Sequence, residues 1–333
     1  MSLTQKLLVT FFSILTVSFS ALAYNVNPNK ISLSGISAGA FFAHQMQVTY
    51  SQTLTGGVAM IAGGSYNCSR GSLNTAMNSC MKISGLQTSV DQTHLDILNL
   101  SKSKKIDSFE NIAKTKVFLI SGKFDDVVFT PVVDKVEELY LKLNVPTENI
   151  KYNKSIEMGH AFPTLNYGNK CSSPRSAPFI SNCNYDGAYE ILSFFYGALE
   201  NKKNEIAKNL LPYSQSSFFA AKFGAQISMS DTAAVYVPTR CQLGEECSLH
   251  VAFHGCLQSR QDIGDDYLHK LGFNDWAESN NIIVLYPQVT KNYFLGNPNA
   301  CWDWWGYTGA DYANKNSVQM NIVYKMIQDL IKK

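Results

Sequence analysis

Residues 35–39 read Gly-Ile-Ser-Ala-Gly and match the pattern G-x-S-x-G. The periodicity predicts a short strand directly before this run (31–34) and a helix directly after it (38–50). A serine between such elements is typical of a nucleophile elbow, where flanking glycines relieve crowding in a tight turn. The helix N-terminus would also stabilise an anion formed there. We therefore predict that Ser37 is a nucleophile; an ordinary strand-to-helix turn is the alternative.

A serine hydroxyl needs a neighbouring base to become a good nucleophile. His160 stands in the run Met-Gly-His-Ala-Phe-Pro (158–163), just past a predicted strand at 150–156. Loops at the carboxyl ends of parallel strands carry the catalytic groups of α/β sheets. We predict that His160 is the base; a structural loop histidine is the alternative. The remaining histidines lie in other contexts: His44, His94, His250, His254 and His269.

The imidazole of such a base needs a carboxylate to orient it. The predicted strand 117–121 ends in the run Gly-Lys-Phe-Asp-Asp-Val-Val (122–128), which offers Asp125 and Asp126. The order Ser37, Asp125, His160 is the chain order of an α/β-hydrolase triad. The Gly-x-x-Asp spacing favours Asp125, and Asp126 is the fallback.

An oxyanion hole needs two backbone N–H donors. The first should be that of Ala38, the residue after the nucleophile. The second normally comes from a His-Gly loop that precedes the serine, yet the only suitable run, 251–256, follows the strand 249–254 far downstream. The Cys256 N–H is the expected second donor, and His254 is expected to order this loop rather than to act as a base.

The downstream position of this loop predicts the fold. Strands alternate with helices along the chain, which favours a mostly parallel sheet with helices on both faces. In the usual α/β-hydrolase the oxyanion loop and a helix precede the elbow; here the chain begins just before the elbow and ends with a predicted helix at 317–331. We therefore predict a circularly permuted α/β-hydrolase. The polar stretch 201–216 could join two halves, but we expect one domain. The remaining predicted elements are strands at 58–62, 233–237 and 282–286, and helices at 131–143 and 185–199.

Composition narrows the class of protein. Of 333 residues, 45% are hydrophobic and 16% charged, and the net charge is only +2, so neither disorder nor a nucleic-acid partner is expected. Lys6, an apolar run at 7–19 and the small-x-small site 21–23 predict a signal peptide at 1–23, and the run is shorter than the roughly 20 residues of a membrane span. We expect residues 24–333 to form a secreted catalytic domain, extracellular or periplasmic, without a stable membrane anchor.

The eight cysteines suit an exported chain with disulfides. Pairing near neighbours gives 68–80, 171–183 and 241–247, and leaves 256 with 301, although other connectivities stay open. Zinc is not expected, because no Cys-x-x-Cys pair or His/Cys cluster occurs. No metal or organic cofactor is needed for the chemistry. The candidate disulfide residues are Cys68, Cys80, Cys171, Cys183, Cys241, Cys247, Cys256 and Cys301.

Four runs together resemble one family: GISAGAFF (35–42), MGHAFP (158–163), HGCLQ (254–258) and NPNACWDWWGY (297–307). They are similar to the secreted poly(3-hydroxybutyrate) depolymerases, most closely the single-domain type with a permuted catalytic domain. The resemblance implies a serine esterase acting on a short-chain aliphatic polyester through an acyl-enzyme. It carries the triad roles onto Ser37, Asp125 and His160, and the oxyanion donors onto Ala38 and Cys256. Many bacterial members add a linker and a polymer-binding module; none is expected here, so adsorption would rest on the catalytic domain.

Three of the four tryptophans lie at 302–305. If Cys301 pairs with Cys256, this segment is tied beside the oxyanion loop, and flat aromatic faces there would suit an apolar chain. We expect Trp302 and Trp305 to line the substrate groove; core packing is the alternative.

Two other functions share these features. A secreted esterase for acetylated or feruloylated polysaccharide, or for short acyl lipids, would use the same triad. A non-catalytic polymer-binding protein would keep only the fold. We expect a polyester or small ester as substrate and a monomer as the acting unit.

Overall fold

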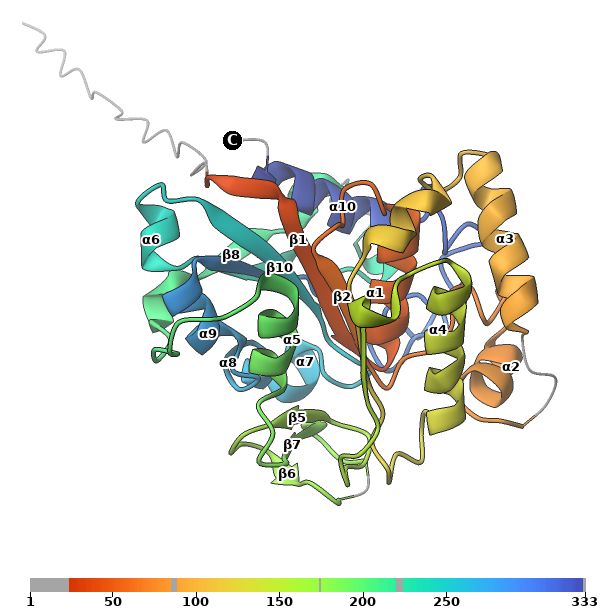
Figure 1. The fold of residues 1–333 in the computed structure, drawn as a ribbon, viewed down its shortest axis with the longest axis horizontal. Helices are drawn as coiled ribbons and strands as arrows, with labels where there is room; N and C mark the ends of the chain where they lie inside the picture. Colours follow the sequence, from red (N-terminus) through yellow and green to blue (C-terminus); the bar gives the residue numbers. More distant parts are fainter. Residues whose placement is uncertain (1–23, 85–88, 174, 220–223, 332–333) are drawn as a thin grey trace, which may run out of the picture.

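The chain is described by a computed structural model that covers residues 24–84, 89–173, 175–219 and 224–331; the predicted signal segment lies outside this part. Figure 1 shows a central sheet between layers of helices. The main sheet consists of β1 (Val26–Ile36), β2 (Gly57–Ile61), β3 (Val117–Ile120), β4 (Ile150–Asn153), β8 (Leu210–Ser214), β9 (Thr232–Tyr236), β10 (Cys247–Phe253) and β11 (Ile282–Tyr286). A small second sheet consists of β5 (Phe162–Thr164), β6 (Asn169–Lys170) and β7 (Ile180–Asn182).

Helices connect most of these strands. They are α1 (Ala38–Thr49), α2 (Leu73–Thr75), α3 (Val90–Lys102), α4 (Thr130–Lys142), α5 (Gly187–Tyr196), α6 (Thr239–Gln242), α7 (Arg260–Ile263), α8 (Asp266–His269), α9 (Phe273–Asn280) and α10 (Val318–Ile331). Shorter helical turns are η1 (Ala76–Cys80), η2 (Phe109–Lys114), η3 (Thr147–Asn149), η4 (Ala207–Asn209), η5 (Ser216–Phe218) and η6 (Ala225–Ile227).

The strand order explains the unusual order of the motifs. It runs β4-β3-β2-β1-β10-β11-β9-β8, parallel except for β9, which is antiparallel to both its neighbours. The chain starts in the centre at β1, proceeds to one edge, restarts at the other edge with β8 and returns to the centre with β10. Figure 1 places α10, the last described helix, beside the start of β1. Joining α10 to β1 there would put the predicted oxyanion loop and α10 ahead of the elbow, so the predicted permuted α/β-hydrolase fold is confirmed.

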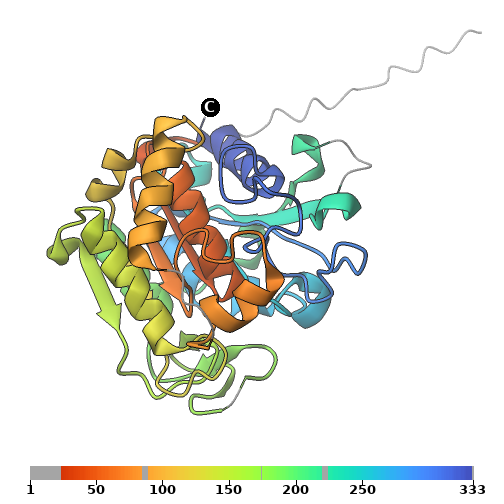
Figure 2. The ribbon, with the colours of Figure 1, turned by 90° about the vertical axis from the view of Figure 1, so that its right-hand side faces the viewer.

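Both faces of the sheet are buried, as expected for parallel strands covered by helices. In β2, Val58 and Met60 point into one core, and Ala59 and Ile61 into the other. The first core is closed by α1, α3, α4 and α10, and the second by α5, α8 and α9. Figure 2 shows α1, α3 and α4 gathered on their face. The two cores hold the strands rigidly, so their carboxyl ends can position side chains.

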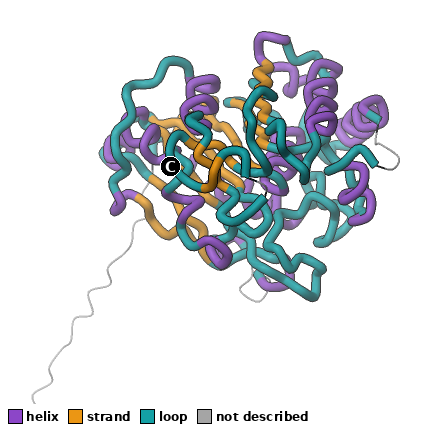
Figure 3. Tube along the Cα trace, turned by 90° about the horizontal axis from the view of Figure 1, so that it is seen from below, coloured by secondary structure: helices purple, strands orange, loops and turns teal. Residues whose placement is uncertain are grey.

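Loops and the small second sheet cover the end of the main sheet where β1 and β10 finish (Figure 1). Figure 3 views the molecule from this side and shows how much of it is loop. Four disulfides are present, and the pairing of near neighbours is confirmed: Cys68–Cys80, Cys171–Cys183, Cys241–Cys247 and Cys256–Cys301.

The largest departure from the predicted elements is at 201–216, where we considered a polar joining segment. The structure forms the edge strand β8 there, antiparallel to β9. Pro212 is tolerated because an edge strand has one side free of ladder hydrogen bonds. Other differences are shorter bounds for β4 and α5 than the periodicity suggests. No helix in the described part of the chain has both the length and the apolar character needed to cross a bilayer.

Three histidines are fully buried within this framework: His44, His250 and His254. His250 joins the two central strands, since its ring nitrogens lie 2.7 Å from Ser32 Oγ and 2.8 Å from Ser34 Oγ on β1. Burial lowers the pKa of His250 to about 3, and burial likewise lowers the pKa values of His44 and His254 to about 4. All three are therefore neutral in the folded protein at neutral pH.

These shifts predict loss of stability in mild acid. The folded pKa values lie below the value of about 6.5 in an unfolded chain, so the unfolded state binds more protons below that pH. The stabilisation is complete above pH ~6.5 and falls as the pH drops towards 4, by up to ~1.4 kcal/mol per pH unit for each histidine. Urea unfolding followed by circular dichroism between pH 7.5 and 4.5 measures this slope. His250→Gln should make the slope shallower; an unchanged slope would contradict the role given to His250.

Candidate active site

Ser37 occupies the sharp turn between β1 and α1. Its backbone has φ 54° and ψ −124°, a region that residues other than glycine rarely adopt. The Ser37 N–H stabilises this turn by donating a hydrogen bond to the Ile61 carbonyl at 2.9 Å. The flanking glycines are required by space. A Cβ at Gly35 would lie 2.2 Å from the Gly39 carbonyl oxygen, and one at Gly39 would lie 2.3 Å from the Phe253 carbonyl oxygen.

His160 and Asp125 are in direct contact. The Nδ1 of His160 lies 2.9 Å from Asp125 Oδ2 and 3.1 Å from Oδ1. Asp125 Oδ1 also accepts the N–H groups of Val127 and Val128, at 2.9 and 3.0 Å. The carboxylate side chain is 1% exposed and the imidazole 7%. A buried carboxylate held by two N–H donors fixes the ring orientation and leaves Nε2 for other chemistry. Asp126, in contrast, is exposed.

The loops that carry this pair are locked to each other. The N–H groups of Lys123 and Phe124 donate to the carbonyls of Ile156 and Met158, at 2.9 and 3.0 Å. Gly122 lies so close to the second loop that a Cβ there would be 2.2 Å from the Met158 carbonyl oxygen. The carboxyl ends of β3 and β4 therefore act as one rigid support for the pair.

The downstream His-Gly loop lies against the elbow, as the permuted topology requires. A Cβ at Gly255 would be 3.3 Å from Ser37 Cβ. The N–H of Gly255 donates to Gln258 Oε1 at 2.8 Å, and that of Leu257 to the Asn299 carbonyl at 2.7 Å. Between them, the Cys256 N–H has no hydrogen bond to any residue that the structure describes. Ala38 begins α1, so its N–H has no acceptor within the helix.

His254 does not face the cavity as a base. Its Nδ1 lies 2.8 Å from the Gly255 carbonyl oxygen, so this nitrogen carries a proton and donates it. Its Nε2 accepts the Val289 N–H at 3.4 Å. The structure thus agrees with the prediction that His254 orders the loop.

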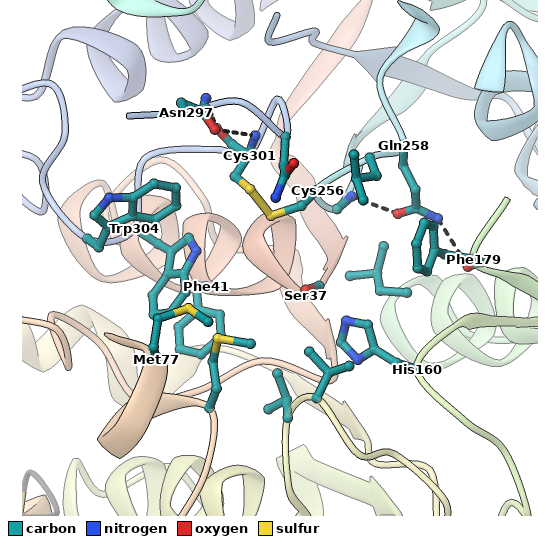
Figure 4. Close-up of a pocket in the computed structure, with 18 of the residues that line it drawn as sticks. Ser37, Phe41, Met77, His160, Phe179, Cys256, Gln258, Asn297, Cys301 and Trp304 are labelled. Atoms are coloured by element: carbon teal, nitrogen blue, oxygen red, sulfur yellow. Dashed lines mark hydrogen bonds between the residues drawn. A yellow bond between two sulfur atoms is a disulfide. The ribbon is translucent and has the colours of Figure 1, made fainter. Parts of the chain in front are cut away.

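Ser37 and His160 line one cavity of about 430 Å³ (Figure 4). Figure 4 shows Ser37 between His160 and Phe179 on one side and Phe41, Met77 and Trp304 on the other. The apolar wall includes Phe41, Leu73, Met77, Met81, Val127, Val128, Phe179, Trp304 and Trp305. The polar groups comprise Arg175, Gln258, Asn297 and Asn299. The cavity suits a mostly apolar ligand with a few hydrogen-bonding groups.

The tryptophans require a correction. Trp305 lines the cavity as expected, but Trp302 is fully buried and stacks on Phe42 with ring centroids 4.5 Å apart. The expectation for Trp302 was wrong because its side chain points into the core behind the wall. Trp304 takes its place, stacked on Phe41 at 4.2 Å.

Sequence reasoning also missed the wall formed by Leu73, Met77 and Met81. No motif marks these residues. The available signal was their position within and just after the loop that Cys68 and Cys80 close.

The sheet, the elbow and the facing His160–Asp125 pair define an α/β-hydrolase. Comparison with known proteins gives the family. The Polyhydroxybutyrate depolymerase of Talaromyces funiculosus is 35% identical over 326 residues, covering 93% of this chain and 91% of that protein. The Poly(3-hydroxybutyrate) depolymerase of Delftia acidovorans is 38% identical over 311 residues, covering 92% of this chain. The chain belongs to the polyhydroxybutyrate depolymerase family.

Solved structures agree. The crystal structure of the PHB depolymerase from Penicillium funiculosum matches with a TM-score of 0.84 and 34% identity, covering 93% of this chain and 98% of that one. A serine-to-alanine variant of a PHB depolymerase, complexed with an R3HB trimer, matches with the same TM-score and coverage and 33% identity. This chain spans only 60% of the length of the Delftia protein. No family model matches this chain.

The two adjacent carboxylates allow a matched test of the candidate triad. Asp125→Asn should lower kcat on a soluble p-nitrophenyl ester by about 10³- to 10⁴-fold, because an amide cannot stabilise the charged imidazole. Asp126→Asn, a change of the same kind at an exposed site, should leave kcat within about twofold. Equal losses in both variants, or a loss in the second alone, would contradict the assignment.

Proposed function

We propose that this chain hydrolyses the ester bonds of poly(3-hydroxybutyrate) or a closely related short-chain polyester. The observation that carries this proposal is the convergence of Ser37, the His160–Asp125 pair and the Cys256 loop at one apolar cavity. The family membership supports the same substrate class, since its relatives are named for this polymer. All the proposed groups come from one chain, which supports a monomer as the acting unit.

The proposed mechanism follows from the positions of these groups. Ser37 Oγ attacks the ester carbonyl carbon while His160 Nε2 takes its proton, and the N–H groups of Ala38 and Cys256 bind the resulting oxyanion. Collapse of this tetrahedral intermediate breaks the carbon–oxygen bond to the leaving alkoxide, which takes the proton from His160. Water then attacks the acyl-enzyme with His160 again as base, releasing the carboxylic acid and restoring Ser37. Asp125 holds the imidazole and stabilises its charged form throughout.

We further propose that the protein is exported after loss of residues 1–23. Four disulfides support this, because such bonds persist in oxidising compartments.

The direct test is release of soluble 3-hydroxybutyrate species from an amorphous polymer suspension. The wild-type chain should release them, and Ser37→Ala should lose nearly all activity because it removes the hydroxyl proposed to form the acyl-enzyme. A panel of soluble esters, including acetyl and feruloyl esters, run in parallel separates the alternatives. Activity on the panel without release from polymer would point to an esterase of another substrate class.

An insoluble polymer must also be held at the surface. Next to the cavity, Asn292 and Asn297 exchange two 2.8 Å backbone hydrogen bonds and form the base of a hairpin. Its tip presents Tyr293, 77% exposed, and Phe294, fully exposed. Gly296 and Asn297 line the cavity, so this hairpin adjoins it. Exposed aromatic side chains at such a place suit contact with an apolar solid.

Phe294→Ser should therefore weaken action on the polymer more than on a soluble ester. A phenyl ring that buried half its surface on the polymer would contribute about 1 to 1.5 kcal/mol, which corresponds to about a five- to tenfold change in adsorption. Initial rates on suspended polymer and on p-nitrophenyl butyrate measure the two effects. Leu243→Ser is the control, because Leu243 is 78% exposed but lies near the amino end of β10, away from the cavity. Equal losses from both changes would refute a local adsorption role.

A further inference from the structure

Gln258 is buried at the site, yet it takes no part in the bond-making and proton-transfer steps of the proposed hydrolysis. Its side chain joins two segments that are far apart in the chain (Figure 4). Oε1 accepts the Gly255 N–H at 2.8 Å, and Nε2 donates to the carbonyls of Pro178 and Phe179, at 3.0 Å each. Gln258 is 1% exposed. Since both amide protons and the oxygen are engaged with backbone groups, Gln258 is not a group that binds substrate.

One end of this link acts on the Gly255–Cys256 peptide. The Gly255 carbonyl and the Cys256 N–H belong to the same rigid plane and point in opposite directions. His254 Nδ1 donates to that carbonyl at 2.8 Å, and Gln258 holds the Gly255 N–H on the preceding peptide. Together they leave the plane little freedom to rotate. The direction of the Cys256 N–H is thereby set without any contact to that N–H itself.

The other end acts on the segment beside His160. The Phe179 carbonyl accepts a hydrogen bond from Gln258. It also accepts one, at 2.9 Å, from the N–H of Phe162, which lies two residues after His160. Phe179 has φ 56°, in the left-handed region that is costly for a bulky residue, so its conformation needs support from its surroundings. Its ring lines the cavity opposite Met77 and Trp304.

We propose that Gln258 is a positioning residue that fixes the proposed oxyanion donor Cys256 relative to the His160 loop. The proposal rests on the proposed ester-hydrolase function of the site. The proposed oxyanion loop belongs to the second part of the chain, and His160 belongs to the first. In this proposal, the amide side chain of Gln258 sets the separation between them. A misplaced donor weakens binding of the transition state more than binding of the ester.

Gln215 provides a matched control. It is fully buried and has the same bonding pattern: its Oε1 accepts the Gln288 N–H at 2.8 Å, and its Nε2 donates to the carbonyls of Ser230 and Gln288, at 2.6 and 2.8 Å. It does not line the cavity. A substitution there removes three hydrogen bonds of the same kind. Its nearest link to the His-Gly loop is indirect, through the Val289 N–H, which lies 3.4 Å from His254 Nε2.

The experiment compares Gln258→Met and Gln215→Met on p-nitrophenyl butyrate. Gln258→Met should lower kcat by about 10- to 100-fold, somewhat less than removal of an oxyanion donor, with KM within about twofold. Gln215→Met should keep kcat even if its melting temperature falls equally. Unchanged kcat in Gln258→Met, a change confined to KM, or equal kcat losses in both variants would overturn the proposal.

Gln258→Glu adds a second measurement, the pH dependence of activity. A residue that only stabilised the fold would not change that dependence. An ionised carboxylate would face the two carbonyl oxygens of Pro178 and Phe179, and burial beside them raises the pKa of that carboxyl. Protonation restores one donor. The activity ratio of this variant to wild type should therefore rise as the pH falls from 8 to 5, while the ratio for Gln258→Met stays flat. A flat ratio for Gln258→Glu as well would overturn the proposal.

The proposed role of Gln258 can fail in these experiments while the proposed function stands. A wild-type chain that hydrolyses the soluble ester, together with unchanged kcat in Gln258→Met, would refute the role of Gln258 alone. A wild-type chain that hydrolyses neither the ester nor the polymer would refute the function and this inference together.

Discussion

The positive φ of Ser37 is the constraint on which the rest of the structure depends. That conformation projects the hydroxyl away from the sheet, but it also brings the start of α1 within touching distance of the end of β10. Only a glycine at position 39 fits against the Phe253 carbonyl, and only a glycine at 255 fits easily beside Ser37. The elbow and the proposed oxyanion loop are thus two sides of one close contact. The parallel pairing of β1 with β10 holds this contact in register.

The permuted connectivity changes the path of the chain but not this contact. The break lies near the start of β1, at the opposite end of the sheet from the loops that form the site. The site can therefore be assembled from either order of segments, provided that β1 and β10 remain neighbours. In either order the Cys256 loop and the His160 loop are far apart in the chain, so tertiary contacts must bring them together. The buried amide of Gln258 is a side-chain link between them.

Much of this arrangement follows from local sequence patterns, and the exceptions have physical reasons. Ser37, Asp125 and His160 each lie just past a strand, so their places at one end of the sheet could be predicted from period and order. The burial of Trp302 could not be predicted, because an irregular loop has no fixed periodicity that distinguishes residues lining the cavity from residues in the core. The edge strand β8 was hidden by Pro212 and its polar neighbours. Gln258 was visible as part of a motif, but its task depends on carbonyls some 80 residues away in the chain.

The disulfides show how a cavity built from loops keeps its shape. Three of the four close segments that line it: Cys68–Cys80 encloses Leu73 and Met77, Cys171–Cys183 encloses Phe179, and Cys256–Cys301 joins the oxyanion loop to the tryptophan segment. Apart from short elements such as α2, η1 and β7, these segments are irregular, and they lie outside the main sheet. Cross-links limit the conformations open to such loops, whereas the central strands are held by packing on both faces. The disulfides therefore support the shape of the site more than that of the sheet.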